Sequence, residues 1–266
     1  MSLFLVILAA GEGKRLKSEV PKPFIIIKGK TVLEHSINAF KEFRQIKNVI
    51  VVYNKKHKKY LDKIKIKNIK KILGGKSRQE STFYALKKLK KMKCKKVLIH
   101  DAARPCPPSN LINSLLKNLQ KYPAVIPIIK VNDATKRIAN KIIFKNIKRK
   151  DLGFAQTPQG FTFEKIYKKH QNNKNIIFDD DSALFTQDND EVLGINGSKK
   201  NLKITDNEDL KIFESFLKSK IYYGIGFDIH RLTTKRKLYL SGIKIKSPVG
   251  TLGHSDGDPV LHATID

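Results

Sequence analysis

LAAGEGKRLKSEVPKPF, residues 8–24, directly follows an apolar run, FLVI at residues 4–7. A short apolar run of this kind is typical of a strand buried in a sheet. Gly11 and Gly13 follow this expected strand. Glycine allows the backbone to turn tightly and to approach a ligand closely. The stretch therefore predicts a strand that ends in a ligand-binding loop.

Two cations in this loop, Arg15 and Lys22, indicate the kind of ligand. Backbone N–H groups and positive side chains together suit a polyphosphate. The spacing is not that of the P-loop, which has four residues between its glycines and then Gly-Lys-Ser/Thr. It also lacks the third glycine of the dinucleotide-binding fingerprint. What remains resembles the loop with which sugar-nucleotide and cytidylyl transferases hold a nucleoside triphosphate.

Length and composition set outer limits on the protein. The 266 residues are enough for one large α/β domain and a further fragment. No apolar run reaches the length of a membrane span, and the apolar N-terminus lacks the basic region of a signal peptide. Cys94 and Cys106 have no metal-binding spacing and suggest no disulfide framework. We therefore expect a cytoplasmic protein without a membrane partner.

The formal net charge of +30 raises the question of nucleic-acid binding. The lysines are scattered over every predicted helix, as at Lys87-Lys88 and Lys168-Lys169, and they are not interleaved with aromatic residues. Lys, Ile and Asn are all favoured by A/T-rich codons, so genome composition explains the bias. We expect no specific nucleic-acid partner, and only weak binding to anions at low salt.

Strand and helix patterns alternate through about residue 220. This alternation predicts a mostly parallel, Rossmann-like α/β sheet covered by helices. The expected strands are 3–9, 48–53, 69–73, 96–100, 124–129 and 192–195. The expected helices are 31–42, 78–92, 108–121, 163–171 and 206–219. Thr31 with Glu34, and Asp206 with Asp209, have the spacing of capping boxes at the starts of the first and last helices.

Two segments depart from this alternation. Residues 130–150 are polar and basic without helical periodicity, and we expect a protruding arm there, which would suit dimerisation. A new strand is expected in YYGIGFDIH at 222–230, so we divide the chain into domains 1–220 and 221–266. The second is too short for a core of its own without metal, disulfides or partners. We expect it to be the truncated start of an α+β metal-binding domain, with the final HATID beginning a helix.

Four further segments place polar groups at expected strand ends and helix starts. Ligands of open α/β sheets bind at the carboxyl ends of strands, so these segments are candidates for one site. They are GGKSRQES at 74–81, HDAARP at 100–105, RKDLGFAQTPQGF at 149–161 and NLKIT at 201–205.

Taken singly, each of these residues has a structural alternative. Asp101 is also suited to cap the following turn, and Arg104 to pair with a carboxylate. Thr157 precedes a proline, as turn residues do, and Lys203 is one lysine among many. Taken together, the motifs AAGxGxRL, PK, GGxxRxxS, HDAARP, QTPQ and NLKIT resemble the 2-C-methyl-D-erythritol 4-phosphate cytidylyltransferase family over residues 3–219.

The resemblance implies a reaction in which a phosphate monoester attacks the α-phosphorus of CTP and pyrophosphate leaves, with Mg²⁺ bridging the phosphates. Arg15 and Lys22 match residues that stabilise the transition state of the family's reaction. Arg149, Thr157 and Lys203 match positions that hold the methylerythritol phosphate, and we count them with the catalytic residues. Such a reaction needs positioning and charge neutralisation more than a general base, because the attacking phosphate is already ionised.

The same resemblance implies the remaining binding residues. The expected nucleotide-binding residues are Ala10, Gly11, Gly13, Gly75, Ser81, Asp101 and Ala102, with Gly75 and Ser81 reading the cytosine and Asp101 near the metal and ribose. The expected substrate-binding residues are Arg104, Arg149, Thr157 and Lys203. In the family the arm that carries positions 149 and 157 reaches a neighbouring subunit, which implies a homodimer with shared sites.

Two positions depart from the family pattern. Lys76 stands where a small or acidic residue is common, and Ala134 stands where a threonine commonly lines the substrate pocket. An alternative is a cytidylyltransferase for another polyol phosphate, such as ribitol phosphate, which shares the loop and an HDAARP-like motif. Such an enzyme would not carry the C-terminal motifs described next.

The C-terminal segment carries a metal-binding pattern. Asp228 and His230 alternate on an expected strand and so share one face, and His262 follows GHSDGD. One Asp and two His leave a fourth position open, as a catalytic Zn²⁺ site requires. The motifs GxGFDxHRL and SPVGTLGHSDGDPVLHA resemble the start of the 2-C-methyl-D-erythritol 2,4-cyclodiphosphate synthase family.

This second resemblance implies that Asp228, His230 and His262 bind Zn²⁺ or another divalent cation, with His254 and Ser255 near a substrate phosphate. Ser241 replaces the usual glycine. The family's reaction releases CMP at sites between the subunits of a trimer. Its later segments are absent here, so we expect the trimer contacts and the cyclase (lyase) activity only of a complete domain.

Overall fold

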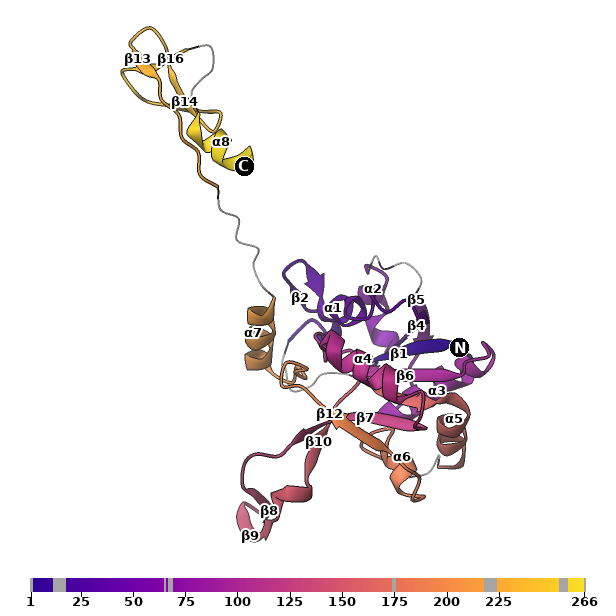
Figure 1. Ribbon diagram of the computed structural model, residues 1–266. Coiled ribbons are helices and arrows are strands. Elements are labelled where there is room, and N and C mark those ends of the chain that lie inside the picture. The colour runs from indigo at the N-terminus through magenta and orange to yellow at the C-terminus, as the bar shows by residue number, and fades with distance from the viewer. Residues whose placement is uncertain are drawn as a thin grey trace. The chain divides into compact units, whose positions relative to one another are not determined.

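The computed structural model of the protein describes residues 2–11, 18–64, 66, 69–173, 176–217, 224–253 and 258–265. The chain divides into two compact units, Met1–Leu217 and Lys218–Asp266. Figure 1 shows both, with the first unit built on a sheet flanked by helices. The loop residues Gly13 and Arg15, and His254 and Ser255 in the second unit, lie outside the described residues.

The first unit is organised around one eight-stranded sheet. Its strands lie in the order β10-β7-β11-β6-β1-β4-β5, with β12 also paired to β7. Their bounds are β1 Leu3–Ala9, β4 Ile46–Tyr53, β5 Ile69–Leu73, β6 Lys96–Asp101, β7 Ala124–Lys130, β10 Gly153–Ala155, β11 Gln159–Thr162 and β12 Leu193–Asn196. Strands β1, β4, β5 and β6 pair in parallel, as does β12 with β7, whereas β10 and β11 run antiparallel to their neighbours. The expected mostly parallel sheet is confirmed.

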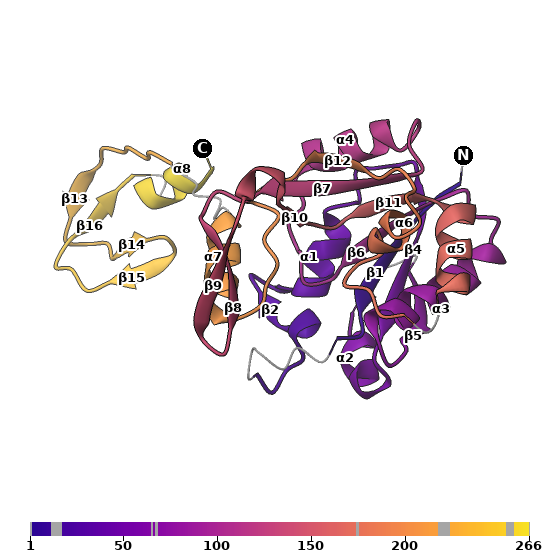
Figure 2. The ribbon, with the colours of Figure 1, turned by 90° about the horizontal axis from the view of Figure 1, so that it is seen from below.

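Strand β1 is buried on both faces, which explains its unbroken apolar sequence. Leu5 and Ile7 pack on the side covered by α1 and α4, and Phe4 and Val6 on the side covered by α3, α5 and α6. The helices are α1 Val32–Asn38, α2 Lys58–Leu61, α3 Arg78–Lys90, α4 Ser109–Asn118, α5 Phe163–Asn172, α6 Ala183–Thr186 and α7 Asn207–Phe216. Figure 2 shows these two helical layers on either side of the strands.

The six expected strands and five expected helices are all present, with ends that differ by a few residues. Both capping boxes form, at Thr31 and at Asp206. The helix expected over 31–42 ends at Asn38, because the chain then turns tightly and buries Phe40 and Phe43. Strand β11 was not expected, since its four residues show no alternation of polar and apolar side chains.

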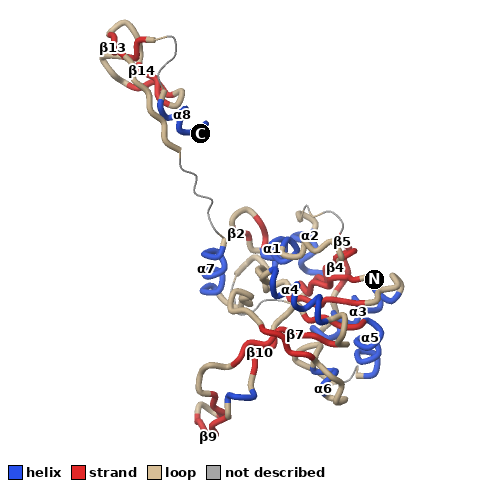
Figure 3. The backbone as a smooth tube through the Cα atoms, in the orientation of Figure 1, coloured by secondary structure: helices blue, strands red, loops and turns tan. Residues whose placement is uncertain are grey.

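The expected arm is present as a hairpin. Strands β8 (Thr135–Ala139) and β9 (Ile142–Ile147) form a two-stranded sheet of their own, which lies away from the main sheet, as Figures 1 and 3 show. The hairpin exposes the large apolar side chains of Ile138, Ile142 and Phe144. Small elements complete the first unit: β2 Ile26–Ile27, β3 Lys30–Thr31, and single turns at Lys22–Phe24, Lys55–His57 and Arg149–Asp151.

The second unit consists of two short hairpins and a helix. Strand β13 (Arg231–Thr233) pairs with β16 (Gly250–Leu252), β14 (Leu238–Leu240) pairs with β15 (Ile243–Ile245), and α8 spans Pro259–Ile265. The expected helix start at HATID is confirmed, but the strand expected over 222–230 is wrong for residues 224–230. A Cβ at Gly224 would lie 1.7 Å from the carbonyl oxygen of Ala263, so this segment packs against the backbone of α8 instead of joining a sheet.

No helix in the described part of the chain combines the length and the apolar character that a membrane crossing requires.

Candidate active site

A pocket of about 580 Å³ lies where β1 and β6 end and α3 begins. It brings together four of the five polar segments singled out in the sequence. Its lining residues are Leu8, Ala10, Gly11, Asn54, Gly75, Lys76, Ser77, Arg78, Ser81, Asp101, Ala103 and Lys203. A site at the carboxyl edge of a parallel sheet is the expected position for a ligand in this architecture.

Asp101 is the only carboxylate among these lining residues. Its Oδ2 lies 2.9 Å from Nζ of Lys203, and its Oδ1 lies 3.5 Å from Nε of Arg78. Burial by itself would raise the pKa of Asp101, but the two cations outweigh it and hold that pKa well below its ordinary value. The carboxylate is therefore ionised at neutral pH and fixed between two positive groups.

Lys22 contacts the segment that carries Lys203. Pro21 and Pro23 flank Lys22 in a single helical turn, and the Lys22 Nζ donates to the carbonyl oxygen of Ile204 over 2.8 Å. The PK pair is thus tied to the NLKIT segment. The Lys22 ammonium thus lies against the backbone of the segment that carries Lys203.

The GGKSRQES segment is packed tightly against the end of β1. A Cβ at Gly74 would lie 2.6 Å from the Cβ of Ala10, so no side chain fits there. The next residue, Gly75, donates its backbone N–H to Oγ of Ser81 over 3.0 Å. This bond joins two of the expected nucleotide-binding residues. Lys76 is exposed at the rim, and its N–H donates to the Glu80 carboxylate.

Thr157 lies inside the domain and not at the arm, so that expectation is wrong. It is buried, and its Oγ1 accepts the backbone N–H of Asp101 over 3.0 Å and lies 3.1 Å from Nδ1 of His100. On the other side of the ring, Nε2 of His100 donates to the carbonyl oxygen of Arg104 over 2.8 Å. Burial lowers the pKa of His100 to about 4, so the ring is neutral and holds the HDAARP turn in place.

Two residues that we expected to line the pocket, Arg104 and Ala102, are buried and are not among its lining residues. Arg104 is buried, and its Nη1 donates to the carbonyl oxygen of Asn201 over 2.7 Å, which ties HDAARP to NLKIT. The structure thus favours the structural alternative for Arg104, with a backbone carbonyl as its partner. Ala102 is buried too, and its neighbour Ala103 lines the pocket.

Arg149 stands apart from the pocket in the described structure. It is exposed at the base of the arm, where its guanidinium donates to the carbonyl oxygen of Asn132. It is not among the residues that line the pocket. Ala134, one of the two departures from the family pattern, is exposed in the same region.

In the second unit, Asp228 lies between two imidazoles. Nε2 of His230 is 3.2 Å and Nε2 of His262 is 3.7 Å from the Asp228 carboxylate. These side-chain types suit zinc, but over residues 224–253 and 258–265 no three His, Cys, Asp or Glu side chains are arranged to hold an ion. No catalytic step follows from this arrangement.

The family model for 2-C-methyl-D-erythritol 4-phosphate cytidylyltransferase matches residues 3–219, most of the chain. The chain belongs to this cytidylyltransferase family. A second family model, the YgbB family, matches residues 221–266. The boundary between the two matches lies next to the boundary between the two compact units.

Two relatives of this cytidylyltransferase-family chain are named as bifunctional enzymes. It is 47% identical over 267 residues to the bifunctional enzyme IspD/IspF of Pelagibacter ubique, covering 100% of this chain and 70% of that protein. It is 34% identical over 274 residues to the bifunctional enzyme IspD/IspF of Wolbachia pipientis, covering 98% of this chain and 68% of that protein.

Solved structures agree on the fold. The 4-diphosphocytidyl-2C-methyl-D-erythritol synthase of Anaerococcus prevotii matches with a TM-score of 0.70 and 29% identity, covering 81% of this chain and 98% of that one. The bifunctional IspDF of Campylobacter jejuni matches with a TM-score of 0.71 and 28% identity, covering 99% of this chain and 68% of that one.

Sequence reasoning missed two polar residues of this cytidylyltransferase-family site. Arg78 lines the pocket, and Asp181 pairs with it from behind over 2.7 Å. Arg78 was visible as the R of GGxxRxxS but was given no role. Asp181 lies in the run DDDS, where nothing in the sequence separates one carboxylate from the next.

Proposed function

We propose that this chain transfers CMP from CTP to 2-C-methyl-D-erythritol 4-phosphate and releases pyrophosphate, a step of the non-mevalonate route to isoprenoid precursors. Membership of the cytidylyltransferase family supports the reaction class. The observation that carries the proposal is the pocket itself, in which Asp101 and Lys203 face the glycine-bearing ends of β1 and β5.

The chemistry requires little covalent help from the protein. An oxygen of the substrate phosphate forms a bond to the α-phosphorus of CTP, and the bond from that phosphorus to the bridging oxygen breaks, so pyrophosphate leaves with the electron pair. A phosphate monoester has a second pKa of about 6, so the nucleophile is ionised at neutral pH. The protein's task is therefore to align two anions and to neutralise the charge that develops between them.

Lys22 and Lys203 are suited to this neutralisation. Both ammonium groups are held by fixed partners, Lys22 by the Ile204 carbonyl and Lys203 by Asp101. A cation that is already positioned needs little reorganisation when charge develops. Arg15, in the same loop, is proposed to act with them on the triphosphate.

The nucleotide is proposed to lie along the loops after β1 and β5. Ala10, Gly11 and Gly13 would offer backbone N–H groups to the phosphates, while Gly75 and Ser81 would meet the cytosine. The packing of Gly74 on Ala10 joins these two loops into one surface. Asp101 and Ala102 would border the ribose from β6.

Mg²⁺ fits this site by the chemistry of its donors, because the ionised Asp101 carboxylate faces the pocket. Bound there with the triphosphate, the ion would screen the phosphate oxygens and the departing pyrophosphate. Lys203 and Arg78 contact the two oxygens of this carboxylate in the structure.

The methylerythritol phosphate is proposed to contact Lys203 and, from the arm, Arg149. Thr157 would act from behind by holding the backbone of Asp101. The exposed apolar side chains of the arm support a homodimer in which the arm of one subunit completes the site of the other.

Residues 221–266 are proposed to be a part of a cyclodiphosphate synthase domain, with Asp228, His230 and His262 as ligands of Zn²⁺ or another divalent cation. The match to the YgbB family supports this assignment. His254 and Ser255 would lie near a substrate phosphate.

Pyrophosphate release from CTP with Mg²⁺ tests the main proposal. Turnover is expected with methylerythritol phosphate and not with ribitol phosphate. Lys22→Ala and Lys203→Ala should abolish it, whereas Lys168→Ala, at an exposed position of α5, should not. Turnover with ribitol phosphate alone would identify the chain as a cytidylyltransferase for another polyol phosphate. No turnover with either substrate would refute the proposal.

A further inference from the structure

A buried carboxylate, Asp181, stands behind the nucleotide pocket and joins it to α5. Its Oδ2 lies 2.7 Å from Nη1 of Arg78, and its Oδ1 accepts from Nε2 of His170 over 3.0 Å. Asp181 and His170 are each 1% exposed. Burial would raise the pKa of Asp181, but Arg78 and His170 outweigh it and lower that pKa, so the carboxylate stays ionised.

Arg78 connects this buried carboxylate to the pocket. Its Nη1 is held by Asp181, and its Nε lies 3.5 Å from Asp101, which in turn contacts Lys203 over 2.9 Å. A guanidinium is planar and rigid, so a partner that fixes one edge also fixes the direction of the other. The position of Asp181 therefore determines where Arg78 presents charge to Asp101.

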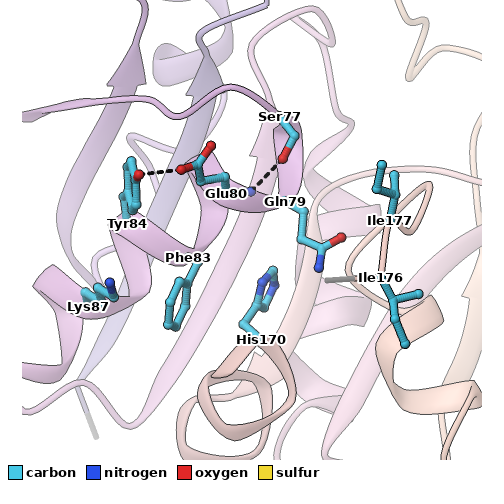
Figure 4. A pocket seen from close by; sticks show the side chains of 9 residues that line it. All are labelled: Ser77, Gln79, Glu80, Phe83, Tyr84, Lys87, His170, Ile176 and Ile177. Carbon is cyan, nitrogen blue, oxygen red and sulfur yellow. Dashed lines mark hydrogen bonds between the residues drawn. The ribbon is translucent and has the colours of Figure 1, made fainter. Parts of the chain in front are cut away.

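His170 fixes the far end of this chain of contacts. Its ring stacks on Phe83, with centroids 6.2 Å apart and an angle of 5° between the planes. Figure 4 shows the ring between Phe83 and Gln79, in a pocket that α3, α5 and residues 176–177 line together. Its Nδ1 is buried without a hydrogen-bond partner among the described residues, so the ring's one polar bond is the one to Asp181.

Stability alone does not account for such an arrangement. Replacing a buried ion pair by apolar side chains of similar volume is often neutral or stabilising, because desolvation offsets the attraction between the charges. Here the polar contacts run in sequence from His170 of α5 through Asp181 and Arg78 to Asp101 and Lys203 at the pocket. We propose that Asp181 and His170 are positioning residues for the transfer reaction, which through Arg78 fix the carboxylate of Asp101 and the ammonium of Lys203 against the bound nucleotide.

This inference rests on the proposed function, and its first test is Asp181→Asn, which keeps the shape of the side chain and removes its charge. We expect the affinity for CTP, measured by calorimetry without the second substrate, to fall, together with a loss in kcat/KM of about 10- to 100-fold, the scale of a small misplacement at a reacting centre. Asp188→Asn is the matched control. Asp188 pairs with Lys169, the neighbour of His170 on α5, but it is not among the residues that line the pocket. This variant should leave both quantities unchanged.

Two variants of His170 separate positioning from folding. His170→Gln keeps an amide donor for Asp181 and should retain CTP affinity, whereas His170→Phe keeps the aromatic packing, lacks the donor and should lose it. Thermal melting of all variants reports folding. If Asp181→Asn and His170→Phe lower only the melting temperature, with CTP affinity and kcat/KM as in the wild type, the proposal is overturned.

The calorimetric measurement also separates this proposal from the proposed function. Wild-type protein that binds CTP but turns over no methylerythritol phosphate would refute the proposed reaction, while the variants' CTP affinities would still decide the role of Asp181. If the wild type binds no CTP, both proposals fail.

Discussion

Nζ of Lys203 lies 2.9 Å from Oδ2 of Asp101, although the two residues come from separate segments, one at the end of β6 and the other just before α7. The contact places one positive and one negative group at the same wall of the pocket. Because Arg78 approaches the other oxygen of the same carboxylate, the one carboxylate among the described lining residues is held from both sides. Four predictions concern this network, the fold around it and the arm.

Asp101→Asn should reduce kcat/KM by about 100-fold or more, on the scale seen when one preorganised polar group is removed from an active site. The amide no longer fixes the Lys203 ammonium, and the Arg78 guanidinium loses one of its anions. Steady-state kinetics with CTP and methylerythritol phosphate measure the effect. Asp62→Asn removes an exposed partner of Lys71 and should leave activity unchanged, so equal kinetics for the two variants would contradict the assigned role.

The free energy of unfolding should fall as the pH drops from about 6.5 to about 4, through the buried His100. The pKa of His100 is lowered to about 4 in the folded chain, against an ordinary value of about 6.5, so in this interval the unfolded chain binds more protons. The contribution is fully present above pH 6.5 and is lost by pH 4. At 1.36 kcal/mol for each unit of difference between the folded and unfolded pKa, it amounts to about 3 kcal/mol.

Denaturant unfolding between pH 4 and 8 measures this effect, and His100→Gln should flatten the curve in that interval. The lowered pKa values of Asp101 and Asp181 act in a different interval. Their contribution is present above about pH 4, the ordinary value of Asp, and is lost only as the pH falls further. A His100→Gln curve that keeps the wild-type slope above pH 4 would show that His100 is not responsible.

Gly74→Ala should destabilise the protein by about 1–3 kcal/mol, the usual cost of overpacking. A Cβ there would lie 2.6 Å from Ala10 Cβ and 2.9 Å from Ser81 Oγ, so the loops after β1 and β5 must separate. CTP affinity should fall with stability, because both loops border the pocket. Gly11→Ala is the matched control for stability, since no atom of the described residues lies within 4 Å of a Cβ at that position. Equal melting temperatures for the two variants would contradict this packing.

For the homodimer proposed above, Ile142→Lys on the arm should shift the protein from dimer to monomer in sedimentation velocity. Ile142 is exposed on a hairpin whose two strands, among the described residues, pair only with each other, so the substitution is directed at the surface and not at the core of its own subunit. Activity should fall with dissociation if arm and pocket belong to different subunits. Wild-type protein that sediments as a monomer would refute the dimer directly.

Much of the fold follows from local sequence. The buried run of β1, the capping boxes at Thr31 and Asp206, and the arm over 130–150 were all predicted correctly, because each depends on residues close together in the chain. The motifs in family order also sufficed to predict the cytidylyltransferase family.

Other features were decided by contacts between distant segments. Whether Thr157 lies at the arm or inside the domain depends on β11 entering the sheet between β6 and β7. Arg104 donates to the Asn201 carbonyl oxygen, and Asp181 pairs with Arg78. Both contacts depend on which loops meet at the carboxyl edge of the sheet. A residue's type and neighbours in sequence determine the chemistry that it offers, but its burial and its partner are set by non-local packing, and only the tertiary structure decides these.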